Sequence, residues 1–248
     1  MNYVIWIFRK LFDKLSKSET SELLPYRKYL FDELMDEYGQ EYFSNKRILE
    51  IGPKDGDDTF RLEKLNPEEI VMFDLPDKSN KTRKWIDDIK VKNQFFEENF
   101  LYISSQKYEQ LGKFKLIWFT GVLYHNPEQL RFIQKLYDKL DDGGVLVLES
   151  ATTRNLLLRN KDVVEIWFPD TYRNTQTISH LPSKGAIKSW LKMVGFTNIF
   201  DSKCFNHKNF NVRNYRYACI ALKGESSKPY TYYAKEEENP DYIIGRSI

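Results

Sequence analysis

A short apolar run that leads into a glycine-containing turn constrains this chain more than any other stretch. Residues 47–51, Arg-Ile-Leu-Glu-Ile, have the composition of a buried strand, and Gly52 and Gly56 follow directly. Glycine has no Cβ, so the backbone can turn tightly there and approach a ligand closely. A helix expected from about Asp57 would direct its free N–H groups at the same place. The stretch predicts a strand–turn–helix unit that binds a nucleotide-type ligand, or an ordinary unit with none.

A second acid lies where a ribose would need one. The apolar run 69–73 ends in Asp74, about 20 residues further on, and a carboxylate there is placed to accept hydrogen bonds from ribose hydroxyls. The turn lacks the three glycines of a pyrophosphate-binding loop, because Lys54 stands at the middle position. Asp57 and Asp58 open the helix, and their charges favour a cationic or zwitterionic ligand.

Apolar strand-like runs alternate with helical segments through the middle of the chain. The expected strands are residues 47–51, 69–73, 93–97, 115–119 and 145–149, with helices over 57–65, 79–90 and 127–140 between them. This alternation predicts an α/β domain with a mostly parallel sheet and helices on both faces. Residues 197–205 and 213–222 predict an antiparallel hairpin at its edge.

Ligands of such sheets bind beyond the carboxyl ends of the strands. The candidate binding residues therefore follow the first four strands and are Gly52 to Gly56, Asp74, Glu98, Asn99, Phe100 and Thr120 to His125. A long segment after the fifth strand, residues 151–181, looks irregular and is rich in aromatic and basic side chains. Loops of that length inside a compact domain are usually functional or disordered, and this composition favours a lid over the substrate.

The chain divides into three parts: N-terminal helices over residues 1–45, the α/β domain over 46–223, and a tail over 224–248. Residues 1–18 predict an amphipathic helix that packs on its own domain or on a second copy, in preference to a membrane surface. The next helix, from Pro25 to about Phe43, would place Tyr26 and Arg27 near the ligand or pack them. Nothing approaches the roughly 18 apolar residues that a membrane span requires.

The charge balance and the cysteines give no indication of a nucleic-acid-binding, zinc-binding or disulfide-rich protein. Lys+Arg total 38 against 36 Asp+Glu, a net charge of +2, which is too balanced to indicate nucleic acid by itself. Cys204 and Cys219 have no metal-ligand spacing and are too few for a disulfide framework. We therefore expect a cytoplasmic protein without a metal site, and a homodimer stays open.

Four segments, taken in order, carry a more specific resemblance. They are residues 119–125 (Phe-Thr-Gly-Val-Leu-Tyr-His), 140–149, 180–183 and 190–196. Together with residues 47–56, they resemble the methyltransferase domain of the tRNA wobble-uridine carboxymethyltransferase group, within the class I methyltransferases that use S-adenosylmethionine (SAM). The resemblance implies a Rossmann-like class I fold, SAM as cofactor with S-adenosylhomocysteine as product, and transfer of the alkyl group by in-line displacement.

The resemblance also implies roles for individual residues. Glu50, Gly52 and Gly56 would line the methionine part of the cofactor, Asp74 would bind the ribose, Asn99 and Phe100 would bracket the adenine, and Thr120, Gly121 and Tyr124 would border the transferring group. Arg213 is the candidate for a late arginine that would hold the carboxylate of a carboxylated SAM. The string around it does not match, and Lys54 replaces a family glycine, so plain methyl transfer is favoured over carboxymethyl transfer.

An alcohol acceptor loses a proton on methylation and therefore needs a base. His125 is the first candidate, and His180 and Glu149 follow; each also has an ordinary structural interpretation. Arg154, Tyr172, Arg173 and Arg213 are candidates for binding the substrate, since arginine binds phosphate and carboxylate well. The leading hypothesis is O-methylation of a small molecule, such as a sugar, a nucleotide-linked compound or another anionic metabolite. A tRNA-modifying alkyltransferase and an inactive SAM-binding protein are the alternatives.

Overall fold

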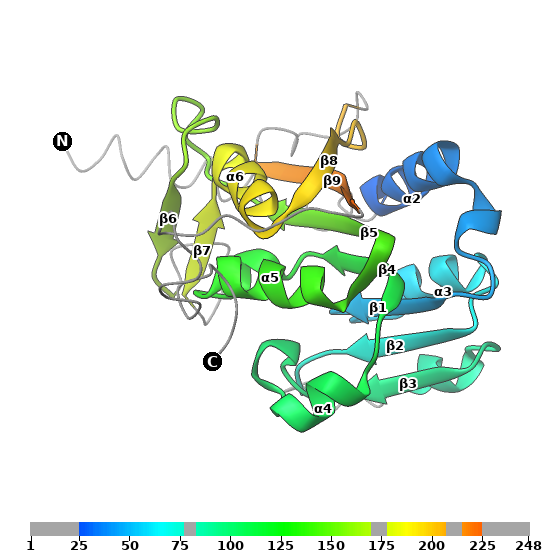
Figure 1. Cartoon of the computed structure of the whole chain (residues 1–248). Helices are drawn as coiled ribbons and strands as arrows, with labels where there is room; N and C mark the ends of the chain where they lie inside the picture. The colour runs from blue at the N-terminus through cyan, green and yellow to red at the C-terminus, as the bar shows by residue number, and fades with distance from the viewer. Residues whose placement is uncertain (1–24, 77–82, 170–177, 207–214, 225–248) are drawn as a thin grey trace, which may run out of the picture.

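A seven-stranded sheet forms the middle of the molecule (Figure 1), in the order β3-β2-β1-β4-β5-β9-β8. The computed structural model describes residues 25–76, 83–169, 178–206 and 215–224. The strands are β1 (Arg47–Ile51), β2 (Glu69–Phe73), β3 (Asn93–Phe96), β4 (Phe114–Thr120), β5 (Leu140–Ala151), β8 (Phe196–Asp201) and β9 (Arg216–Lys223). The first five strands are parallel, and β9 is antiparallel to both β5 and β8. The predicted fold class, with its antiparallel edge hairpin, is confirmed.

Helices cover both faces of the sheet (Figure 1). They are α2 (Pro25–Tyr38), α3 (Asp57–Glu63), α4 (Ser105–Gln110), α5 (Gln129–Lys139) and α6 (Lys184–Val194), with 3-10 turns η1 (Gln40–Tyr42), η2 (Lys84–Asp88), η3 (Phe100–Tyr102) and η4 (Leu123–His125). Successive side chains of a strand point to opposite faces of the sheet, so each apolar strand contributes side chains to the hydrophobic core on each face. Ile48 packs with Leu30 on the face of α2, and Leu49 packs with Phe132 on the face of α5.

The structure differs from two of the predictions about secondary structure. Within the predicted helix 79–90, the described residues form only the short turn η2. The segment 151–181 is not irregular throughout, because β6 (Val164–Trp167) and β7 (Ser179–Pro182) form a separate antiparallel hairpin. Trp167 faces inward with Tyr124 against Ala151 and Leu181, whereas Ile166 is exposed.

The predicted N-terminal helix over residues 1–18 and nearly all of the tail lie outside the described residues. Among the helices that the structure describes, none has the length and apolar character to cross a bilayer.

Candidate cofactor and active site

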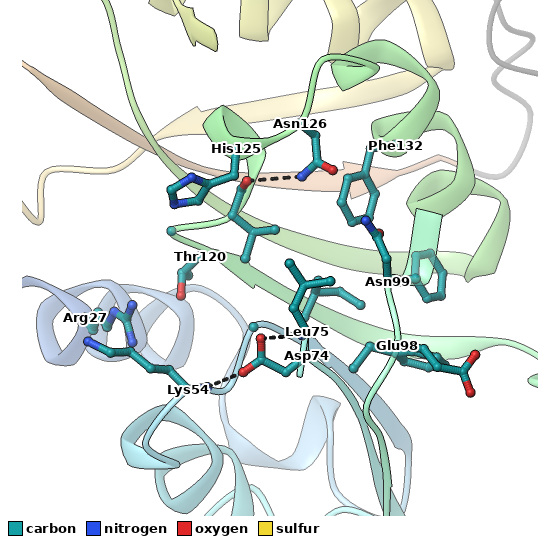
Figure 2. Close-up of a pocket in the computed structure, with 16 residues that line it drawn as sticks. Arg27, Lys54, Asp74, Leu75, Glu98, Asn99, Thr120, His125, Asn126 and Phe132 are labelled. Atoms are coloured by element: carbon teal, nitrogen blue, oxygen red, sulfur yellow. Dashed lines mark hydrogen bonds between the residues drawn. The ribbon is translucent and has the colours of Figure 1, made fainter. Parts of the chain in front are cut away.

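A cavity of about 410 Å³ opens beyond the carboxyl ends of β1, β2, β3 and β4 (Figure 2). This size falls within the usual range for small-molecule sites. Of the residues that the sequence analysis selected, its walls include Gly52, Asp74, Asn99, Phe100, Thr120, Gly121 and His125. Parallel strands end at one edge of a sheet, so loops far apart in the sequence meet there.

The turn after β1 approaches the turn after β4 closely. Gly52 has a φ of 78°, and a Cβ on it would lie 2.5 Å from Val122 Cγ2, so no larger residue fits. Gly56 has a φ of 83° and precedes α3. A Cβ there would lie 2.5 Å from the ring of Trp85, and Gly56 does not line the cavity. The structure therefore assigns Gly56 to packing rather than to the cofactor wall.

Lys54 occupies the middle position of the turn in a left-handed backbone conformation, with a φ of 52°. Its backbone N–H donates to Asp74 Oδ2 at 3.1 Å, and the residue lines the cavity. The requirement at this position is thus a positive φ, which glycine meets more easily than lysine does. The departure from the glycine pattern leaves the shape of the turn intact.

Several contacts fix the orientation of the Asp74 carboxylate at the cavity wall. Its Oδ1 accepts the N–H of Leu75 at 2.8 Å, and its Oδ2 lies 3.6 Å from Arg83 Nη2. A carboxylate offers about four lone-pair positions, so capacity remains for two ribose hydroxyls. Binding of the ribose by Asp74 stays a prediction.

The next part of the cavity suits a purine ring. Asn99 Oδ1 accepts the N–H of Leu101 at 3.0 Å, which leaves the amide NH₂ as a donor. Phe100 is buried between Phe73 and Phe132, with ring centroids at 5.2 and 6.0 Å, and all three rings line the cavity. Apolar walls with a few polar groups are typical of such sites.

Glu50 lies beneath the turn and does not line the cavity. Its Oε2 accepts the hydroxyl hydrogen of Thr59 at 2.6 Å, and the side chain is buried. Burial, assisted by the nearby charge of Asp58, raises the pKa of Glu50 to about 8. Glu50 therefore supports the turn as a mostly protonated acid near neutral pH.

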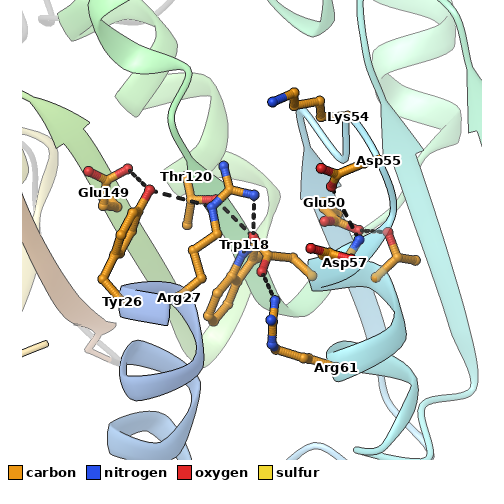
Figure 3. A network of polar contacts seen from close by, with 12 residues as sticks. Tyr26, Arg27, Glu50, Lys54, Asp55, Asp57, Arg61, Trp118, Thr120 and Glu149 are labelled. Carbon is orange, nitrogen blue, oxygen red and sulfur yellow. Dashed lines mark hydrogen bonds and ion pairs between the residues drawn. The ribbon is translucent and has the colours of Figure 1, made fainter. Parts of the chain in front are cut away.

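Asp58 is the centre of a polar network whose other members, Arg27, Arg61, Trp118 and Thr120, are labelled in Figure 3. Its Oδ2 lies 3.0 Å from Trp118 Nε1, 3.2 Å from Thr120 Oγ1 and 3.1 Å from Arg27 Nη1. Its Oδ1 accepts from Arg61 Nη1 at 2.7 Å. The expectation that Asp57 and Asp58 together present negative charge to the ligand is therefore wrong for Asp58, since it is buried and neutralised by arginines.

Arg27 is a cavity residue that the sequence left undecided between ligand contact and packing. While Nη1 pairs with Asp58, Nη2 faces Gly121, at 3.4 Å from the position of a Cβ there. Figure 2 shows Arg27 and Lys54 on one side of the cavity and Glu98 and Asn99 on the other. A SAM molecule has an amino-acid carboxylate at one end and adenine at the other. This charge distribution fits a SAM orientation in which the carboxylate lies near Arg27 and Lys54 and the adenine lies near Glu98 and Asn99.

Glu149 is not available as a base. It is fully buried, and Arg216 binds it through Nε to Oε1 and through Nη2 to Oε2 at 2.7 Å. The hydroxyl of Tyr26 also donates to Oε2, at 3.1 Å. The guanidinium of Arg216 lies between the rings of Tyr26 and Tyr124, at 5.6 and 5.8 Å. Tyr124 therefore packs behind the cavity wall, and the catalytic prediction for Glu149 is contradicted.

The two candidate histidines differ. His125 lines the cavity, and its ring lies 4.0 Å from that of Tyr124. His125 keeps a solvent-exposed part. Desolvation of the part of its ring that packs against the protein, together with the nearby charge of Arg216, lowers the pKa of His125 to about 4. His180 lies in β7 opposite Ile166 and does not reach the cavity.

Among the predicted substrate residues, Arg154 stacks on the ring of Tyr215 at 5.4 Å and does not line the cavity. Tyr172, Arg173 and Arg213 lie outside the described residues. No cluster of His, Cys, Asp or Glu with the geometry of a metal site occurs within the residues that the structure covers.

The strand order, the turn after β1 and the acid after β2 are those of the class I SAM-dependent methyltransferase fold. The chain belongs to a methyltransferase-domain family, whose model matches residues 23–199. Among curated relatives, a tRNA U34 carboxymethyltransferase of Desulforapulum autotrophicum is 25% identical over 160 residues, covering 63% of this chain and 46% of the relative. One of Campylobacter jejuni is 26% identical over 201 residues, covering 71% and 63%. The chain thus spans about half the length of the curated relatives it matches.

Solved structures share the fold at low sequence identity. The 1,6-didemethyltoxoflavin-N1-methyltransferase of Burkholderia thailandensis, with its substrate and S-adenosylhomocysteine bound, has a TM-score of 0.58 at 11% identity and covers 90% of each chain. The N-terminal domain of EvdMO1 with S-adenosylhomocysteine has a TM-score of 0.56 at 14% identity, over 78% of this chain and 79% of that one.

Proposed function

We propose that this chain transfers the methyl group of SAM to a hydroxyl oxygen of a small anionic acceptor, such as a sugar or a nucleotide-linked metabolite. The observation that supports this most directly is His125, a cavity residue with a pKa of about 4, which is uncharged near neutral pH and able to accept a proton. In Figure 2, His125 lies on the cavity wall apart from Asp74 and Asn99, which leaves room for an acceptor beside it.

When bound, SAM supplies a methyl group on a sulfonium, which becomes a neutral thioether as the new C–O bond forms. The chain has to hold the acceptor oxygen about 3 Å from that carbon and in line with the sulfur, because alignment supplies much of the rate. His125 accepts the hydroxyl proton. A histidine with so low a pKa is a weak base, so the proton leaves as the oxygen attacks and not before.

The β6–β7 hairpin supports an acceptor site next to His125. The side-chain amide of Gln129 donates to the carbonyl of Leu123 at 3.1 Å and to the carbonyl of His180 at 2.7 Å. Those contacts tie the hairpin to the turn η4, which carries His125. We infer that the acceptor lies between them and that Arg154, Tyr172, Arg173 and Arg213 bind its anionic group.

A tRNA acceptor with a carboxylated donor is the second candidate, and the names of the curated relatives favour it. Within the described residues, the late arginine next to the active site is Arg216, and Glu149 already engages it. A donor carboxylate would have to compete with that ion pair. This observation and the near-neutral net charge of +2 favour plain SAM and a small acceptor.

Calorimetry with SAM and with carboxy-SAM tests the proposal, followed by transfer of the labelled methyl group of SAM, or the labelled carboxymethyl group of carboxy-SAM, to a panel of sugars, nucleotide sugars and bulk tRNA. We expect SAM to bind at least as tightly as carboxy-SAM, and the label to appear in a small molecule. Preference for carboxy-SAM, with label transfer to tRNA that weakens steeply with salt, would replace the proposal by the second candidate.

A further inference from the structure

Lys54 is the residue of the cofactor turn whose side chain has no structural explanation in the turn itself. Its φ of 52° puts it in the left-handed region, which disfavours any residue with a Cβ relative to glycine. The one hydrogen bond described for Lys54, to Asp74, comes from the backbone N–H, and a glycine would make it equally well. The side chain therefore needs a separate reason to be there.

The surroundings direct the lysine towards the cavity. Lys54 lines it, and its side chain extends towards the side where Arg27 lies (Figure 2) and away from Asp55 (Figure 3). The carboxylate of Asp55 turns back to the N–H of Asp57, and that of Asp74 is engaged by Leu75 and Arg83. Lys54 has no ion-pair partner in the part of the chain that the structure describes.

One side of the cavity thus carries two cationic groups, Lys54 and the Nη2 end of Arg27, while Asp74 and Glu98 line the remainder. The acidic neighbour of Arg27, Asp58, is shared with Arg61 and buried, so it does not cancel the second cation. Two cations that converge on one side of a cavity, with the ribose acid further along, form a site for a carboxylate.

We propose that the ammonium of Lys54, together with Arg27, binds the α-carboxylate of the amino-acid part of the cofactor. The ligand class is an amino-acid nucleoside: adenosine at one end and a zwitterionic side arm at the other. On this proposal, the positive charge of the Lys54 side chain, which glycine lacks, offsets the cost of its left-handed backbone conformation. The proposal depends on the cofactor alone and is independent of the acceptor, so a wrong acceptor assignment leaves it untouched.

Two ligands separate this role from a general effect on the turn. S-adenosylhomocysteine has the carboxylate, whereas 5′-methylthioadenosine shares the adenosine and the thioether and has no amino acid. The variants are K54M, which removes the charge, K54R, which keeps it, and K54G, which removes both charge and backbone strain. Lys64, exposed at the end of α3, supplies a matched control, K64M.

We expect K54M to weaken S-adenosylhomocysteine about tenfold in calorimetry, as for loss of a charge-assisted hydrogen bond, and to leave 5′-methylthioadenosine unchanged. K54R and K64M should bind both ligands like the parent. The difference between the parent and K54M should shrink at high salt. K54G should lose the same affinity while its melting temperature rises by roughly 2 °C, since the strain is relieved.

Equal affinity of K54M and the parent for S-adenosylhomocysteine would overturn the proposal. So would an equal loss for both ligands, which would place the effect on the turn and the adenosine. Retained binding of 5′-methylthioadenosine also serves as the proof that each variant is folded.

Discussion

Arg27 and Asp58 form an ion pair of 3.1 Å that joins the first turn of α2 to the first turn of α3 beneath the cofactor cavity. The adjacent Tyr26 donates a hydrogen bond to Glu149 on β5. Two neighbouring residues of one helix therefore attach it to elements on both sides of β4, near the turns that follow β1 and β4. Arg27 thus belongs both to the cavity wall and to the contacts that support it.

Replacing Arg27 tests whether its guanidinium both supports the fold and contributes to cofactor binding. We expect Arg27→Met to lower the melting temperature by several degrees, because Asp58 loses one of two arginine partners while buried. It should also weaken S-adenosylhomocysteine at least as much as K54M does. Calorimetry and thermal denaturation measure the two effects. Arg61→Met, which removes the other partner away from the cavity, should show the loss of stability without the tenfold loss of affinity.

The ribose assignment predicts a loss of cofactor affinity on removing the carboxylate of Asp74. We expect Asp74→Ala to weaken SAM by roughly 10- to 100-fold, since about two charge-assisted hydrogen bonds are lost. Asp57→Ala, an exposed acid on α3, is the control and should bind normally. If Asp74→Ala retains the affinity of the parent, the ribose lies elsewhere.

His125 is expected to act in the chemical step and not in binding. His125→Ala should reduce kcat by about 10²- to 10⁴-fold and leave S-adenosylhomocysteine affinity unchanged. Because the base has to be unprotonated and its pKa is lowered to about 4, turnover should stay level from pH 6 to 8 and fall only as the pH drops towards 4. His180→Ala should retain activity. A rate that rises through pH 6.5 would indicate a histidine with an ordinary pKa instead.

The buried pair of Arg216 and Glu149 predicts a large effect on stability. Arg216→Met leaves the carboxylate of Glu149 buried with Tyr26 as its remaining described partner, which costs about 3–5 kcal/mol. Thermal unfolding of Arg216→Met, Glu149→Leu and the double variant checks this. The double variant should be more stable than Arg216→Met, since no unpaired charge is left. Simple additivity of the two losses would argue against a coupled pair.

Glu50 predicts an unusual dependence of stability on pH. Its pKa is about 8 in the folded chain and near 4.5 when unfolded, so the folded state holds the extra proton between these values. The contribution of Glu50 to stability is therefore complete below pH 4.5 and is lost as the pH rises through 8. Glu50→Gln should melt at a higher temperature than the parent at pH 8.5 and show a flatter profile from pH 5 to 8. Parallel profiles for the two proteins would refute the assignment.

The periodicity of the sequence was sufficient to predict the sheet and the loops that form the cavity. Gly52, Asp74, Asn99 and Thr120 come together because each follows a parallel strand, and that relation depends only on strand direction. The pairing of β5 with β9 could not be predicted from strand periodicity. Ala151 lies opposite Arg216 through an antiparallel register that no local pattern specifies, and this register brings Arg216 to Glu149.

Three further features were not predicted from the sequence, each for a specific structural reason. Gly56 has the spacing of a cofactor glycine, yet its neighbour is Trp85, a contact between segments far apart in sequence. The β6–β7 hairpin was missed because four residues with alternating exposure, such as Val164 to Trp167, give too short a signal. Asp58 was expected to present its charge to the ligand, and the sequence could not reveal its burial because that depends on Trp118 and Arg27 from other elements.

The position of β9 between β5 and β8 has a consequence for how the molecule is made on the ribosome. Tyr26 lies early in the chain and its hydrogen-bond acceptor Glu149 stays an unneutralised buried charge until Arg216 has been synthesised. Domains usually fold as their segments emerge. We therefore expect α2, which contributes Arg27 to the cavity wall, to dock fully only after β9 has been synthesised.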